Sequence, residues 1–240
     1  MTQKAMDLSI VIPVNNEEQN IGILYERLKD SLKSLRGGYE IIFVEDGSKD
    51  NSYGELCAIH QRDKSVNVVK LKKNFGQTMG LLVGMNFVRS EVIITMDGDL
   101  QHDPQDILKL VEKINMGYDV VNGKKERRKI TKRLICLLFG LGYYDINSSF
   151  RAYRSKIVND IKDRGEAFRF LPLLAREKKI NLCEVDIACR KRKFGKTHYH
   201  FMGRLNRLAR DVFLLLSMRQ EKGLMKKIDP GRFVSELRFH

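Results

Sequence analysis

Asp97 and Asp99, separated by one glycine, are the side chains of this sequence best suited to chemistry. They follow residues 91–96, an apolar run that predicts a β-strand. Ligands bind at the carboxyl ends of strands in open α/β sheets, and Gly98 would let a ligand approach the backbone closely. Carboxylate oxygens suit Mg²⁺ or Mn²⁺, which commonly join one or two protein carboxylates to substrate phosphates. The motif therefore indicates a metal–diphosphate site, and an acidic turn that caps the helix near Pro104 is the alternative.

Strand and helix patterns alternate along the first half of the chain. Apolar runs predict the strands, and an apolar residue at every third or fourth position predicts the helices between them. The predicted strands are residues 8–13, 39–44, 66–71, 91–96 and 118–122, and the predicted helices are residues 21–35, 50–61, 76–88 and 104–116. In the less regular second half, residues 182–187 predict a further strand. This alternation predicts an α/β fold with a mostly parallel, Rossmann-like central sheet and helices on both faces.

Polar residues follow several of these strands, at Pro13–Glu17, Asp46 and Asp97–Gln101. The carboxyl ends of parallel strands share one edge of the sheet, so these residues are expected to form a pocket of the kind that binds nucleotides. Each has a structural alternative. Glu17 could be an acidic residue favoured by a helix N-terminus, and Asp46 with Gly47 could be a simple turn.

The chain of 240 residues carries a formal net charge of +14, which indicates an anionic partner such as nucleic acid, a membrane surface or a phosphorylated substrate. The basic residues concentrate at 124–133, 190–196 and 204–227. The four cysteines form no Cys-x-x-Cys pair and residues 1–4 show no secretory leader, which favours a reducing cytoplasm. No apolar run approaches the roughly 20 residues that span a bilayer.

Several motifs occur in an order typical of one enzyme family. They are Ile12–Ile21, Val44–Ser48, Asn74–Gly76, Met96–Pro104, Asp145 followed by Ser149–Tyr153, and Arg190 followed by Gly195–Thr197. Together they resemble the family 2 glycosyltransferases with a GT-A fold. Within that family the sequence looks most like the dolichyl-phosphate mannosyltransferase and polyprenyl-phosphate glycosyltransferase branch. The resemblance covers about residues 7–215.

The resemblance implies an inverting transfer of a hexose from a nucleotide sugar, such as GDP-mannose or a UDP-sugar, to a polyprenyl or dolichyl phosphate. It assigns nucleotide-sugar binding to Pro13, Asn15, Glu17, Asp46 and Asp97. It assigns Mg²⁺ or Mn²⁺ to Asp97, Asp99 and Gln101, with Asp99 and Asp145 as catalytic residues. It assigns donor and acceptor phosphates to Arg128, Arg190, Arg192 and Lys196.

Other interpretations stay open for single residues and for the whole chain. Asp145 could be a helix N-cap, and His102 could be a surface histidine rather than a residue that helps to seat the metal. A nucleic-acid-binding module is not favoured, because no nucleic-acid motif is present and the acidic strand ends would repel phosphate without a metal. A glycan or protein acceptor, or an inactive subunit of an assembly, remains possible for a chain with these motifs.

The expected organisation is a catalytic domain over residues 1–215 and a basic C-terminal tail over residues 216–240. An amphipathic helix is predicted at 202–218, with apolar residues that either pack as a core or subunit contact or face lipid. A polyprenyl acceptor stays in the bilayer, so the basic residues predict peripheral binding to an anionic membrane on its cytoplasmic face. A membrane-anchored subunit is the alternative partner.

Overall fold

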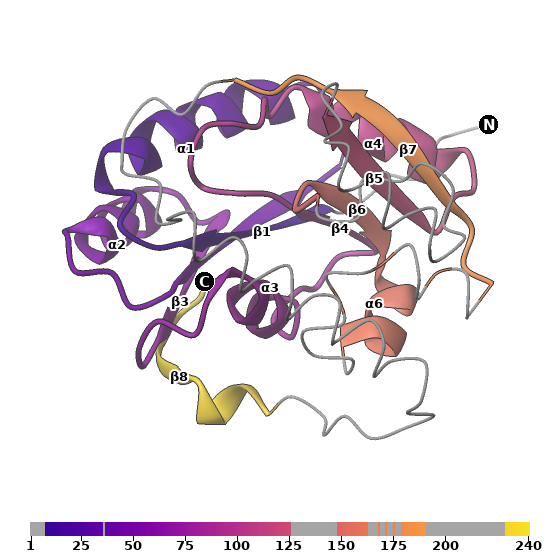
Figure 1. Ribbon diagram of the computed structural model, residues 1–240. Helices are drawn as coiled ribbons and strands as arrows, with labels where there is room; N and C mark the ends of the chain where they lie inside the picture. The colour runs from indigo at the N-terminus through magenta and orange to yellow at the C-terminus, as the bar shows by residue number, and fades with distance from the viewer. Residues whose placement is uncertain are drawn as a thin grey trace, which may run out of the picture.

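The computed structural model describes residues 8–35, 37–125, 148–162, 168, 171, 175, 179–190 and 229–240 (Figure 1). These residues form one eight-stranded sheet in the order β7-β5-β6-β4-β1-β2-β3-β8. The strands are β1 Leu8–Val14, β2 Tyr39–Glu45, β3 Val66–Leu71, β4 Val92–Thr95, β5 Val120–Lys125, β6 Arg151–Arg154, β7 Leu182–Ile187 and β8 Val234–Arg238. No helix among the described residues has the length and apolar content to cross a membrane.

Parallel pairing dominates the sheet, as the alternation of strands and helices predicts. β1 pairs in parallel with both β2 and β4, β2 with β3, and β5 with β7. Only β6 and β8 run antiparallel to their neighbours in the described sheet. The predicted fold class, a mostly parallel sheet with flanking helices, is therefore confirmed.

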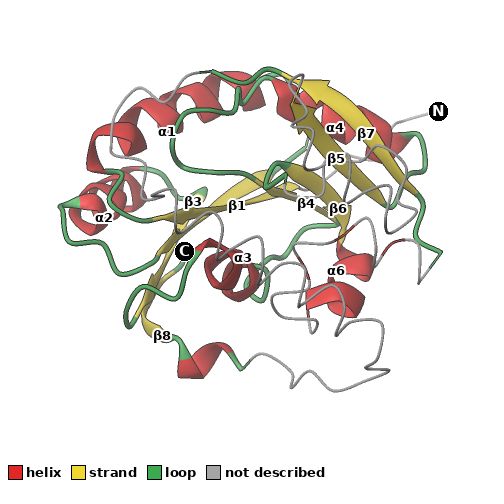
Figure 2. Ribbon diagram, in the orientation of Figure 1, coloured by secondary structure: helices red, strands yellow, loops and turns green. Residues whose placement is uncertain are grey.

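Helices cover both faces of the sheet (Figure 2). They are α1 Glu18–Leu32, α2 Ser52–Arg62, α3 Gln77–Gly84, α4 Asp106–Asn115 and α6 Ser155–Lys162. One apolar cluster joins α1, α2 and α4 to the sheet, and a second joins α3 and α6 to the opposite face. Successive strand residues point to opposite faces. Ile41 and Phe43 of β2 accordingly belong to the first cluster, while Ile42 and Val44 belong to the second.

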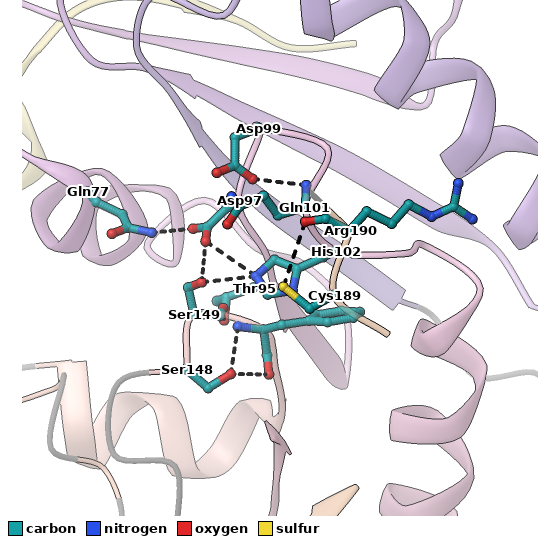
Figure 3. Close-up of polar contacts among 11 residues, drawn as sticks. Gln77, Thr95, Asp97, Asp99, Gln101, His102, Ser148, Ser149, Cys189 and Arg190 are labelled. Atoms are coloured by element: carbon teal, nitrogen blue, oxygen red, sulfur yellow. Dashed lines mark hydrogen bonds and ion pairs between the residues drawn. The ribbon is translucent and has the colours of Figure 1, made fainter. Parts of the chain in front are cut away.

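Helix α3 lies unusually close to the sheet because glycine forms its contact. A Cβ atom at Gly84 would lie 2.5 Å from Cγ1 of Val11 and 2.7 Å from Cγ2 of Val44. A Cβ atom at Gly80 would lie 3.0 Å from Cβ of Pro13. This packing places Gln77, the first residue of α3, over the carboxyl ends of the central strands (Figure 3).

Strands β6 and β8 are not among the strands predicted from the sequence. Residues 216–240 were assigned to a basic tail, but Val234–Arg238 form β8, which pairs antiparallel with β3 at the edge of the sheet. Lys72 N donates to the Phe233 carbonyl, and the Phe233 ring lies against Phe75. Val234–Arg238 are therefore part of the sheet, while the predicted boundary at residue 215 lies outside the described residues.

Candidate functional site

The predicted site residues follow the carboxyl ends of adjacent strands. Strand β1 lies between β2 and β4, so the segments after these three strands meet at one edge. Asp46 N donates to the Val14 carbonyl (2.8 Å), and Met96 N donates to the Val11 carbonyl (3.2 Å). A Cβ atom at Gly98 would lie 3.3 Å from the Pro13 carbonyl oxygen, so the loop after β4 passes directly beside the end of β1.

The Asp46 side chain holds a turn that comes from another part of the chain. Its two carboxylate oxygens accept from the backbone N–H groups of Phe75 (2.7 Å) and Gly76 (2.8 Å). Asn15 Nδ2 donates to the Asp46 carbonyl (2.6 Å). Burial raises the pKa of Asp46 and nearby Glu45 adds to the rise, while the two backbone hydrogen bonds oppose it. Asp46 thus connects residues 15–17, the loop between β1 and α1 (the β1 loop), with the turn that begins α3.

Glu17 lies at the start of α1, where it was expected to bind the nucleoside or to favour the helix N-terminus. Its side chain is buried, and its carboxylate accepts from Asn20 Nδ2. Its backbone N–H donates to Ser52 Oγ (2.9 Å), which fixes the start of α1 against the start of α2. Asn16 before it has a φ of 57°, and its Oδ1 accepts from Lys49 N (2.8 Å). The β1 loop is therefore anchored on both sides.

Asp97 lies at the centre of a polar network in the loop after β4 (Figure 3). Its Oδ1 accepts from Gln77 Nε2, and its Oδ2 accepts from Ser149 Oγ (2.6 Å). Asp99 turns the loop, because its Oδ1 accepts from the Gln101 backbone N–H (3.1 Å). The two aspartates and Gln101 thus come from one short loop, as predicted. Gln77 and Ser149 join Asp97 from outside it.

His102 is completely buried, so the interpretation as a surface histidine is wrong. Its Nε2 lies 3.3 Å from Asp97 Oδ2 and 3.4 Å from Ser149 Oγ. Its ring centroid lies 5.0 Å from that of Phe150. An isolated antiparallel bridge joins its backbone to Cys189. The segment after β7 therefore lies beside the loop that carries the aspartates.

Arg190, which was expected to bind phosphate, lies beside the same loop but pairs with a carboxylate. Its backbone N–H donates to the Gln101 carbonyl (2.8 Å), and its Nη2 lies 2.6 Å from Asp103 Oδ2. The guanidinium is half exposed, so it remains within reach of solvent. Four further predicted site residues lie outside the described residues: Arg128, Asp145, Arg192 and Lys196.

Three side chains of this network were not among the predicted site residues. Gln77 follows the Asn74–Gly76 motif directly, Ser149 opens the Ser149–Tyr153 motif, and His102 lies inside the motif of the aspartates. Their positions inside or next to these motifs were the only features of the sequence that could have identified them as site residues. Their contacts with Asp97 depend on chain segments that approach from α3 and from the start of β6.

The donor set of this loop fits a divalent cation that also binds a diphosphate. Asp97 and Asp99 supply carboxylate oxygens, and Gln101 supplies an amide, all suitable for Mg²⁺ or Mn²⁺. Among the described residues, no group of three or more His, Cys, Asp and Glu side chains gathers around a metal position. A site with two carboxylates needs further oxygens, and substrate phosphates usually provide them for such ions.

Comparisons with known proteins show the family of the chain. The family model described as "Glycosyl transferase family 2" matches residues 9–160. An undecaprenyl-phosphate 4-deoxy-4-formamido-L-arabinose transferase from Photorhabdus laumondii is 35% identical over 210 residues, covering 83% of this chain and 65% of the relative. The enzyme of the same name from Pseudomonas paraeruginosa is 36% identical over 210 residues, covering 83% of this chain and 62% of the relative. The chain thus spans less than two thirds of the length of these relatives.

Solved structures share the fold at low sequence identity. A glucosyl-3-phosphoglycerate synthase from Mycobacterium tuberculosis, solved with Mn²⁺, uridine diphosphate and glucosyl-3-phosphoglycerate, superposes with a TM-score of 0.69 and 16% identity. The match covers 88% of this chain and 79% of the synthase. At this identity the likeness establishes the fold, and it agrees with the predicted GT-A architecture.

Proposed function

The chain belongs to glycosyl transferase family 2, and we propose that it transfers a sugar, with inversion, from a nucleotide sugar to a polyprenyl phosphate. One observation carries the proposal: Asp46 and the Asp97–Asp99 loop directly follow the two strands that flank β1. Nucleotides bind at this edge of open α/β sheets. The names of the relatives, undecaprenyl-phosphate 4-deoxy-4-formamido-L-arabinose transferases, support a polyprenyl-phosphate acceptor.

The nucleoside would bind between the β1 loop and the turn before α3. Pro13, Asn15, Glu17 and Asp46 lie on this side, and Asp46 keeps the Phe75–Gly76 turn in place through its two hydrogen bonds. Because the loop is anchored at both ends, little conformational freedom would be lost when the nucleoside binds. These residues therefore bind and orient the donor and do not take part in bond breaking.

The diphosphate would bind at Asp97, Asp99 and Gln101 together with Mg²⁺ or Mn²⁺. When bound, such a cation neutralises the charge that develops on the leaving nucleoside diphosphate. The two carboxylates would hold the cation, and the hydrogen bond from Gln101 N to Asp99 fixes the turn of the loop that carries them.

The acceptor side is a prediction from residues that lie mostly outside the described part of the chain. An acceptor phosphate is already anionic at neutral pH, so it needs little help from a general base. Asp145 would then orient the acceptor more than remove a proton. Arg128, Arg192 and Lys196 would bind phosphates with Arg190, whose guanidinium has further N–H groups besides the one that reaches Asp103.

A polyprenyl acceptor requires contact with a membrane. The basic residues 204–227 would provide peripheral, salt-sensitive binding to anionic lipid on the cytoplasmic face, worth about 1 kcal/mol for each cation near the surface. Flotation with neutral and anionic vesicles tests this, using a triple substitution of Arg204, Arg207 and Arg210 to Glu. Equal binding to both vesicle types, or binding to neither, would instead favour a membrane-anchored protein partner.

The decisive experiment is a transfer assay preceded by a binding screen. Thermal shifts with GDP-, UDP- and dTDP-sugars in Mg²⁺ or Mn²⁺ identify the donor, because selective binding to the folded state raises the apparent stability. The selected donor is then supplied with undecaprenyl phosphate, dolichyl phosphate, a glycan or a peptide. Preferred transfer to a lipid phosphate supports the proposal. Preferred transfer to a glycan or peptide would show that the acceptor is not a lipid phosphate. Donor binding without turnover would indicate an inactive subunit of an assembly.

A further inference from the structure

His102 occupies a position where an ordinary core residue would be apolar. Its side chain has no exposed surface, and its ring packs against the buried ring of Phe150. Its Nδ1 is buried and has no hydrogen-bond partner in the part of the chain that the structure describes. A buried polar atom without a partner costs stability. His102 therefore lowers the stability of the fold, whereas a leucine or methionine at this position would leave no buried polar atom without a partner.

The other ring nitrogen explains why a histidine is useful there. Ser149 Oγ, His102 Nε2 and Asp97 Oδ2 form a triangle with sides of 2.6, 3.3 and 3.4 Å (Figure 3). Ser149 has one hydroxyl proton, and the shortest side of the triangle directs it to Asp97. The geometry is then satisfied if Nε2 of His102 carries a ring proton and donates it toward Asp97 and Ser149. Both groups thus act on the same carboxylate oxygen.

We propose that His102 and Ser149 are positioning residues that fix the carboxylate of Asp97 for the divalent cation. This inference rests on the proposed function, in which Asp97 and Asp99 hold that cation. By holding Oδ2, the two residues restrict rotation of the Asp97 side chain, so the Asp97 carboxylate is oriented before the cation arrives. Groups that hydrogen-bond a metal ligand in this way typically change metal affinity by about 10- to 100-fold when removed.

Direct binding of the cation by His102 is the competing role, and the geometry disfavours it. Nδ1 is enclosed in the core, while Nε2 faces Asp97 and Ser149. The backbone bridge to Cys189 holds the residue in this orientation. His102 therefore acts through Asp97.

The test measures Mn²⁺ binding by the electron paramagnetic resonance signal of free Mn²⁺ with UDP or GDP present, compared with the same mixture without protein because the nucleotide itself binds Mn²⁺. His102→Leu removes the donor and is expected to weaken Mn²⁺ binding by roughly 10- to 100-fold. His102→Gln keeps a donor near the Nε2 position and is expected to restore most of the affinity. In the Asp97→Asn background, His102→Leu is expected to cause no further loss, because its effect passes through Asp97.

The neighbouring serines provide a matched pair. Ser149→Ala removes the other hydrogen bond to Asp97 and is expected to weaken Mn²⁺ binding several-fold. Ser148→Ala is the control, because the Ser148 hydroxyl bonds to the backbone of Phe150. In steady-state assays, His102→Leu and Ser149→Ala should raise the Mn²⁺ concentration for half-maximal activity and change kcat at saturating Mn²⁺ much less.

The outcomes separate this inference from the proposed function. If Asp99→Asn abolishes Mn²⁺ binding while His102→Leu and Ser149→Ala bind as the wild type does, the positioning role is overturned and the metal site stands. If the wild type itself binds no Mn²⁺ with either nucleotide, the metal-dependent function is refuted, and the positioning role is refuted with it. If His102→Leu does not fold by circular dichroism, the comparison of Ser149→Ala with Ser148→Ala decides, since equal affinities would overturn the proposal.

Discussion

The Phe233 ring lies edge-on to the Phe75 ring, with centroids 5.0 Å apart and planes at 80°. Phe75 also donates its backbone N–H to Asp46, so the aromatic contact and the proposed nucleoside side of the site share one residue. Lys72 Nζ adds bonds to the carbonyls of Gly231 and Arg232, each 3.1 Å long. The segment that leads into β8 therefore braces the turn that Asp46 holds.

We expect Phe233→Ala to weaken both the fold and nucleotide binding. An aromatic pair of this geometry contributes about 0.5–1.5 kcal/mol beyond the apolar area that it buries. Its loss should also free the Phe75–Gly76 turn and lower UDP or GDP affinity several-fold in calorimetry. Leu237→Ala, in the strand β8 that follows Phe233, is the control, because Leu237 is 48% exposed. An equal change of nucleotide affinity in both variants would contradict the coupling.

Gly76 and Gly117 offer a second matched comparison, since both have positive φ angles, 90° and 102°. A Cβ atom at either position would have no heavy atom within 4 Å, so alanine would strain only the backbone. Such strain costs on the order of 1–3 kcal/mol. Urea unfolding should show comparable losses for Gly76→Ala and Gly117→Ala. Nucleotide affinity should fall only for Gly76→Ala, whose N–H donates to Asp46; a comparable fall in Gly117→Ala would refute the local explanation.

The parallel core of the fold was predictable because its signals are local. Apolar runs such as residues 8–14 and 39–45 are buried on both faces of the sheet, and they were recognised without knowledge of their partners. Strand β8 was not predicted because Val234–Arg238 contains only two apolar residues, which do not alternate with the polar ones, and none of its residues is buried. Its partner β3 lies far away in the sequence, which a local pattern does not reveal.

The candidate site was predictable in position but not in its contacts. Strand ends located Asp46, Asp97 and Asp99, because residue order alone brings the carboxyl ends of parallel strands together. The burial of His102 depends on the bridge to Cys189, and the hydrogen bond of Ser149 to Asp97 depends on how the start of β6 approaches β4. Such long-range contacts follow from packing and leave no periodic pattern in the sequence.

Asp63 should make stability depend on pH far from the site. Burial raises its pKa, but hydrogen bonds from Lys29, Ser65 and Tyr25 outweigh burial and hold the pKa below its ordinary value. The carboxylate therefore contributes stability above the unfolded-state pKa of about 3.9, and this contribution is lost as the pH falls through the folded-state pKa.

We expect Asp63→Asn to lower the unfolding free energy at pH 7 by roughly 2 kcal/mol, the scale of a hydrogen bond to a charged group. The difference from wild type should shrink as the pH falls below about 4, in urea unfolding at a series of pH values. Asp30→Asn is the control, since its pair with Lys33 is exposed and should contribute little. A difference that is constant from pH 7 to pH 3 would exclude the ionised carboxylate as its source.

Asp99→Asn tests the metal site itself. A neutral amide is a much poorer ligand for a hard cation than a carboxylate, so sugar transfer should fall more than about 100-fold. This loss exceeds the roughly 10- to 100-fold loss expected when a residue that only hydrogen-bonds a metal ligand is removed. The melting temperature without metal should stay close to that of the wild type. Glu112→Gln, which neutralises an exposed acid on α4, should keep full activity. EDTA should silence the wild type and added Mg²⁺ or Mn²⁺ should restore it, whereas full transfer in excess EDTA would eliminate the metal-dependent mechanism.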